Sequence, residues 1–169
     1  LKGIPNKEGW ADLAAGLKYA LIDDRDAQFI LTPGFTVELP TGQSKVFQGN
    51  GDGEWNAFVS ASKGFNNLHL TANTGVRLPN DGNEETASWH YSAMADYYTC
   101  RWFIPFAVVN GFTVLSEGDA LPFNTEGYDL INFGSTDANG WTGVLVGGGF
   151  RSRLHQKVDL GFAYEVAVA

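Results

Sequence analysis

A strict alternation of residue types in the segment 68–79, LHLTANTGVRLP, is the feature that most constrains the fold of this chain. One set of alternate positions is mostly apolar: Leu68, Leu70, Ala72, Thr74, Val76 and Leu78. The intervening set is mostly polar: His69, Thr71, Asn73, Gly75 and Arg77. A period of two residues indicates a β-strand with one apolar and one polar face. Both a soluble sandwich and a membrane barrel contain such strands.

Strand-like runs of this kind recur along the chain, separated by turn residues. We predict eight of them, over residues 10–22, 27–42, 54–64, 68–79, 87–99, 102–115, 140–153 and 157–168. The segment 10–21, WADLAAGLKYAL, contains good helix formers, but its alternation favours a strand. Pro33 lies inside a predicted strand and lacks a backbone N–H, which predicts a bulge or local irregularity there. The chain 1–169 is therefore expected to be one all-β domain.

The connections between these runs alternate between short and long. The short ones are 23–26, 65–67, 100–101 and 154–156, and the long ones are 43–53, 80–86 and 116–139. In an up-and-down meander, alternate connections lie at opposite ends of the sheet. Tight turns at one end and long loops at the other are typical of outer-membrane β-barrels. We therefore predict an antiparallel transmembrane β-barrel in the bacterial outer membrane, in contact with outer-membrane lipid.

Composition agrees with a barrel and excludes several other classes of protein. Charged residues make up 18% of the chain, below the roughly 25% of soluble domains. Aromatic residues lie near the predicted strand ends, as in the girdles of membrane barrels. The net charge of −8 and the lack of a Lys/Arg cluster argue against a nucleic-acid partner. The single cysteine, Cys100, excludes a disulfide within the chain and a cysteine-based metal site.

The alternation also predicts which side chains line the barrel interior. The apolar set should face lipid, and the polar set should face the lumen, because ionisable groups persist in a membrane only where they meet water or one another. The predicted lumen-lining residues are Asp12, Lys18, Glu38, His69, Asn73, Arg77, His90, Asp96, Asp159 and Glu165. Such charges either line a path or pair as a plug, and both alternatives remain open at this point.

The long segment 116–140 is too apolar for a loop surrounded by water. Its apolar residues are Leu121, Phe123, Tyr128, Leu130, Ile131 and Phe133. We expect it either to fold into the mouth of the lumen as a constriction or to dock a protein partner in an envelope assembly.

Catalytic and metal chemistry have little support in the sequence. His90 and Ser92 share one face of a predicted strand and, with Asp96, offer the residue types of a barrel lipid hydrolase. The loops 49–54 and 80–85 are rich in the oxygen ligands that calcium prefers, but neither matches a complete calcium loop. We expect no enzyme activity, no resident metal and no cofactor.

Three segments together resemble a known family: GWADLAAGLKYALIDD (9–24), FTVELPTG (35–42) and PFAVVNG (105–111). In this order they are similar to the outer-membrane β-barrel transporters of the "MetA-pathway of phenol degradation" type. The resemblance implies a channel through which small hydrophobic or aromatic solutes pass by diffusion. The family often has a Glu before the Asn-Gly pair, whereas Val108 and Val109 stand here, so that lumen carboxylate is absent.

The meander also carries an expectation about the ends of the chain. If the long loops are external, the sequence begins and finishes on the outside, whereas bacterial barrels keep both termini in the periplasm. We therefore expect at least one further strand at each end and ten or twelve strands in the full protein. The final residues, EVAVA, also lack the aromatic residue that ends complete barrels.

Overall fold

The computed structural model describes residues 8–42, 52–128 and 131–169, and its regular elements are all β-strands. They are β1 (Leu13–Lys18), β2 (Ile22–Asp24), β3 (Phe29–Leu39), β4 (Glu54–Phe65), β5 (Leu68–Pro79), β6 (Ala87–Tyr97), β7 (Ile104–Ser116), β8 (Thr142–His155) and β9 (Val158–Ala167). No helix capable of crossing a membrane occurs in these residues. The predicted all-β class is confirmed.

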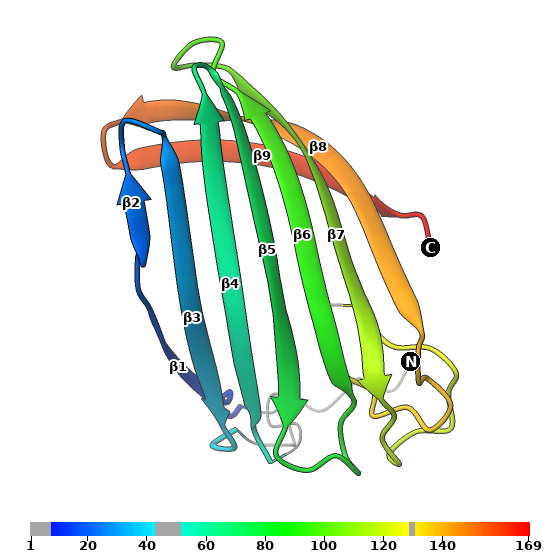
Figure 1. Ribbon diagram of the computed structural model, residues 1–169. Coiled ribbons are helices and arrows are strands. Elements are labelled where there is room, and N and C mark those ends of the chain that lie inside the picture. The colour runs from blue at the N-terminus through cyan, green and yellow to red at the C-terminus, as the bar shows by residue number, and fades with distance from the viewer. Residues whose placement is uncertain (1–7, 43–51, 129–130) are drawn as a thin grey trace.

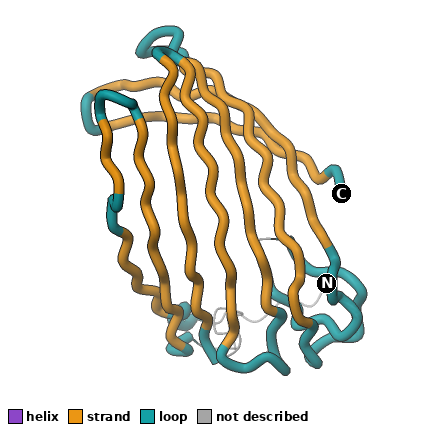
Figure 2. Tube along the Cα trace, in the orientation of Figure 1, coloured by secondary structure: helices purple, strands orange, loops and turns teal. Residues whose placement is uncertain are grey.

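The strands form one antiparallel sheet of nine strands (Figure 1). Its order is β1-β3-β4-β5-β6-β7-β8-β9, and β2 also pairs with β3. Within the described residues β1 and β9 form no ladder with each other, so the sheet is open. The short turns gather at one end of the sheet and the long loops at the other, as the sequence predicts (Figure 2).

The first predicted strand, 10–22, is divided in the structure, and the cause lies opposite Pro33. Lys18 faces Gly34 and Ile22 faces Leu31, so the three residues 19–21 oppose only two residues of β3. The Tyr19 N–H donates to the Pro33 carbonyl oxygen at 3.0 Å. Because the N–H and C=O of a strand residue point to the same side, the missing donor of Pro33 lies on the side of this bulge. The predicted irregularity is confirmed, as a one-residue bulge in the facing strand.

The register gives the sheet one apolar and one polar face. A row across four strands on the apolar face contains Phe35, Ala57, Val76 and Trp89. The neighbouring row on the other face contains Thr36, Asn56, Arg77 and Ser88. Some side-chain hydrogen bonds join strands that are not neighbours in the sheet, and their residues belong to the polar face. Arg151 of β8 bonds to Asp96 of β6, and Asn110 of β7 bonds to Glu165 of β9. Such contacts require inward curvature, so the polar face is the concave one.

Three consecutive glycines, 147–149, allow the sheet to curl tightly at β8. A Cβ atom at Gly149 would overlap the carbonyl oxygen of Phe162, and one at Gly147 would overlap the Glu165 side chain. Glycine at these positions permits strong local curvature. In Figure 1, β8 bends over and β9 runs behind the strands at the front of the view.

Gly75 in β5 provides a test of close packing on the concave face. A Cβ atom there would lie 2.6 Å from Nε2 of His90 and 2.5 Å from the Ala57 carbonyl oxygen. Gly75→Ala should therefore displace His90 and lower the free energy of unfolding by about 1–3 kcal/mol. Denaturant unfolding in detergent or lipid measures this change. Gly161→Ala in β9 is the matched control, because its Cβ would make only ordinary contacts at 3.6 Å. Equal effects of the two variants would contradict the prediction.

Candidate functional site

The concave face is the candidate site, because the register brings the predicted lumen-lining residues onto it. Asp12 directly precedes β1, and its Oδ1 accepts a hydrogen bond from the Gly42 N–H. Lys18 in β1 lies opposite Gly34, and Asn73 in β5 lies between Ser60 and Ser92. The remaining members lie in strands on the same face: Glu38, His69, Arg77, His90, Asp96, Asp159 and Glu165. That this face lines a lumen stays a prediction.

Asp96 is the centre of a polar cluster on this face. Its side chain is only 4% exposed, and its two oxygens bind different partners. Oδ1 lies 2.9 Å from Nδ1 of His69, and Oδ2 accepts a hydrogen bond from Arg151 at 3.0 Å. Arg151 is on β8, two strands away from β6, so this cluster holds the curved part of the sheet together.

His90, the candidate base of a hydrolase, has a different partner from the one a catalytic triad needs. Its Nε2 lies 2.8 Å from Oδ1 of Asn56, across β5. Asp96, the carboxylate that the sequence offered for this triad, binds His69 and Arg151 instead. The described geometry therefore does not assemble His90, Ser92 and Asp96 into a triad.

Further pairs link polar side chains along the same face. Asn110 donates to Oε2 of Glu165 at 3.1 Å, from β7 to β9. Arg153 and Asp159 form an ion pair at 3.1 Å, and Arg77 lies 3.8 Å from Glu54. In these pairs, charged and polar side chains of the sheet bind one another. Ionisable groups inside a membrane need such partners because of its low dielectric constant.

The segment 117–141 folds back onto the long-loop end of the sheet, and a buried carboxylate stabilises its internal conformation. Glu126 is 3% exposed, and its two oxygens accept hydrogen bonds from the backbone N–H groups of Phe133 and Ser135. Asn132 ties the segment to the start of β6, since its side chain exchanges hydrogen bonds with Thr86. Asn132 thus fixes the segment to the sheet, whereas Glu126 fixes the conformation within it.

The apolar residues predicted for this segment have two different environments. Tyr128 packs against Phe112 of β7 and against Trp141, in a small core with Val114 and Ala138. Phe123 and Phe133 stack edge to face at 5.8 Å. Leu121, Phe123 and Ile131 remain exposed. Leu130 lies outside the described residues.

Glu85, in the connection before β6, is a buried carboxyl group among other carboxylates. The residue is 8% exposed. Burial, and secondarily the nearby carboxylates of Glu54 and Glu38, raise the pKa of Glu85 from 4.5 to about 7. Glu84 and Asp12 contribute in the same direction. The neutral form is therefore favoured in the folded protein.

This pKa predicts how stability depends on pH. Because Glu85 titrates near 4.5 when unfolded and near 7 when folded, the free energy of unfolding should fall as the pH rises between these values. It should then level off above pH of about 7. Glu85→Gln should remove this fall and be more stabilising at pH 8 than at pH 4. Denaturant midpoints across this range measure the effect, with Glu117→Gln, at an exposed position after β7, as the control. A pH profile unchanged by Glu85→Gln would contradict the prediction.

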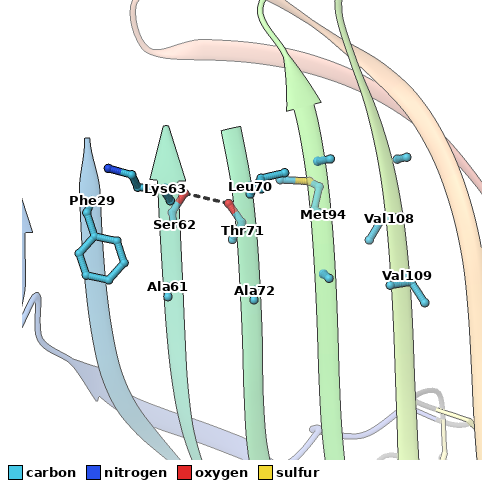
Figure 3. Close-up of a pocket in the computed structure, with 13 residues that line it drawn as sticks. Phe29, Ala61, Ser62, Lys63, Leu70, Thr71, Ala72, Met94, Val108 and Val109 are labelled. Carbon is cyan, nitrogen blue, oxygen red and sulfur yellow. Dashed lines mark hydrogen bonds between the residues drawn. The ribbon is translucent and has the colours of Figure 1, made fainter. Parts of the chain in front are cut away.

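Two of the hollows in the described sheet lie on opposite faces of it. The larger, of about 550 Å³, is on the apolar face over a row of small side chains, Ala61, Ala72 and Ala93, with Phe29 and Leu70 beside it (Figure 3). The smaller, of about 370 Å³, is near the short turns and is lined by residues that include Asp23, Ser62 and His69. The first follows from the absence of large side chains. The second belongs to the concave face.

Within the described residues, no three His, Cys, Asp or Glu side chains are grouped closely enough to hold a metal ion. The loop 80–85 is inside this part of the chain, whereas residues 49–51 of the other calcium candidate lie outside it.

The sequence indicates the orientation of some of these site residues and not of others. Asn56 could be found from the alternation in residues 55–62, WNAFVSAS. Arg151 follows a run of glycines in which both faces look alike, so its direction is not readable. Glu126 lies in a loop, where no period exists to orient it.

No protein-family model, characterised protein or solved structure matches this chain significantly. The arrangement of its own residues is what bears on function.

Proposed function

We propose that this chain belongs to an outer-membrane β-barrel through which small hydrophobic or aromatic solutes pass by passive diffusion. The observation that carries the proposal is the polarity of the sheet. Its exposed face is apolar, with Leu17 71%, Trp55 51% and Phe162 63% exposed, and its polar residues lie on the concave side. A soluble protein rarely exposes so large an apolar surface, whereas a membrane barrel requires one.

The arrangement of the connections supports the same proposal. Short turns at one end and long loops at the other match the periplasmic and external ends of outer-membrane barrels. Among the described strands, β1 and β9 form the edges of the sheet, and each edge would be covered in a closed barrel, directly or through further strands. The segment 117–141 would narrow the external mouth, because Tyr128 rests on the concave side of β7. The resemblance to the phenol-degradation transporter family points to apolar or aromatic solutes.

Single-channel conductance of the full-length protein in a planar bilayer tests the proposal. The protein is measured intact and with the segment 116–140 deleted. Conductance steps that grow on deletion are the expected result. Silence of both forms, with folding shown by circular dichroism, would reject a channel.

A plugged scaffold barrel is the second candidate, and the polar pairs of the concave face favour it. His69, Asp96 and Arg151 bridge β5, β6 and β8, and Asn110 with Glu165 bridges β7 and β9. Such pairs occupy the space that a solute would need. In this case the exposed Leu121, Phe123 and Ile131 would dock an envelope protein. Silence in the conductance experiment is the result that this candidate predicts.

A further inference from the structure

The two ends of the sheet differ in charge. The long connections 40–53, 80–86 and 117–141 contain nine carboxylates and one lysine. The short connections 25–28, 66–67, 98–103 and 156–157 contain three basic residues and one carboxylate. A solute approaching from the long-loop end therefore meets a negative electrostatic potential.

The acidic character continues onto the concave face just inside that end. Glu38 of β3 and Glu54 of β4 lie there, with Asp12 close to Glu38. Arg77 of β5 interacts with both glutamates, at 3.8 Å from Glu54. Among the described residues of this cluster, carboxylates outnumber the cationic side chains.

Glu85 distinguishes this acidic cluster from a group of solvated surface carboxylates, because it is buried. It is 8% exposed, and its carboxyl group forms no hydrogen bond or ion pair with any described residue. Glu54, Glu38, Glu84 and Asp12 surround it with like charge. A buried carboxylate is costly unless a cation or a donor neutralises it, so its ionised form calls for a positive charge from solution.

Within the described residues these carboxylates form no group of three side chains that could hold a metal ion. Several carboxylates at the mouth of a channel would instead attract cations and repel anions that pass through it, as rings of acidic residues do in cation channels.

We propose that the acidic mouth formed by Glu38, Glu54 and Glu85 selects for cationic and neutral solutes and rejects anions. This inference rests on the proposed channel and names the solute class that it admits. The ionisation of Glu85 would strengthen the preference as the pH rises through about 7. The groups facing Glu85 in this titration are Glu54, Glu38, Glu84 and Asp12, with Arg77 beside the first two.

The test is the reversal potential of the full-length protein in a planar bilayer under a potassium chloride gradient, at pH 5.5 and pH 8. At ionic strengths near 0.1 M we expect potassium to be favoured over chloride by about tenfold at pH 8. The preference should be weaker at pH 5.5. Glu85→Gln should abolish the difference between the two pH values, and Glu54→Gln should lower the preference at both. Asp26→Asn, in a short turn at the opposite end, is the control and should change neither.

The outcomes separate this inference from the proposed function. Conductance with no preference, or with a preference for chloride, would overturn cation selection and leave the channel intact. A pH difference that persists in Glu85→Gln would overturn the assignment to that residue. Absence of conductance from the folded protein would reject the channel and, with it, selection by its mouth.

Discussion

Replacing Asp96 with alanine should destabilise the folded sheet by about 2 kcal/mol. The substitution removes two charge-assisted contacts at once, to His69 and to Arg151. It also leaves the Arg151 guanidinium on the concave face without its carboxylate. Because the His69 and Arg151 side chains are 40% and 37% exposed, solvent screens part of the loss, and the effect stays below that of a fully buried pair.

Denaturant unfolding of the two variants Asp96→Ala and Asp159→Ala measures this effect with an internal control. Asp159 also pairs with an arginine, Arg153, but both side chains are more exposed. An exposed pair contributes about 0–1 kcal/mol, so Asp159→Ala should be close to neutral. Equal losses in the two variants would show that the position of Asp96 between three strands has no special role.

Glu126→Ala should loosen the internal structure of the segment 117–141. The substitution removes both acceptors of the Phe133 and Ser135 amides, and hydrogen bonds to a charged group contribute about 1.5–3 kcal/mol each. Loss of both should speed amide hydrogen exchange at these two positions by about 100-fold or more. Hydrogen exchange resolved by residue measures it directly.

Glu126→Gln provides the graded comparison, because a glutamine keeps one acceptor oxygen and should give an intermediate rate. Asp137→Ala, exposed in the same segment, should leave the exchange of Phe133 and Ser135 unchanged. If Glu126→Ala exchanges no faster than the native protein at these amides, the segment is held by other contacts, such as those of Asn132.

The strands and their faces could be predicted because both follow from a period of two residues. The alternation in 68–79 sets which side chains share a face, and the observed register of β5 with β4 and β6 agrees with it. The division of the first strand required more than periodicity. Pro33 predicts an irregularity, but only the pairing of β1 and β2 with β3 shows that the extra residue lies within 19–21.

Contacts between distant parts of the chain could not be predicted from the sequence. The sequence predicts Asp96 as a lumen-lining residue, but its partners His69 and Arg151 depend on register and on the curl of the sheet. Glu126 and Asn132 act within a long loop, where residue type alone does not indicate direction. Glu85 stood in a segment considered for calcium, and its burial reflects tertiary packing.

The glycines 147–149 have a consequence for how solutes would be chosen. They set the radius of curvature of the sheet, because side chains there would collide with β9 and force the strands apart. The width of the concave space therefore depends on backbone packing in β8. The charge at the long-loop end of this space depends instead on the acidic side chains there. In the proposed channel, selection by size and selection by charge would thus depend on separate parts of the chain, and mutation could change either one alone.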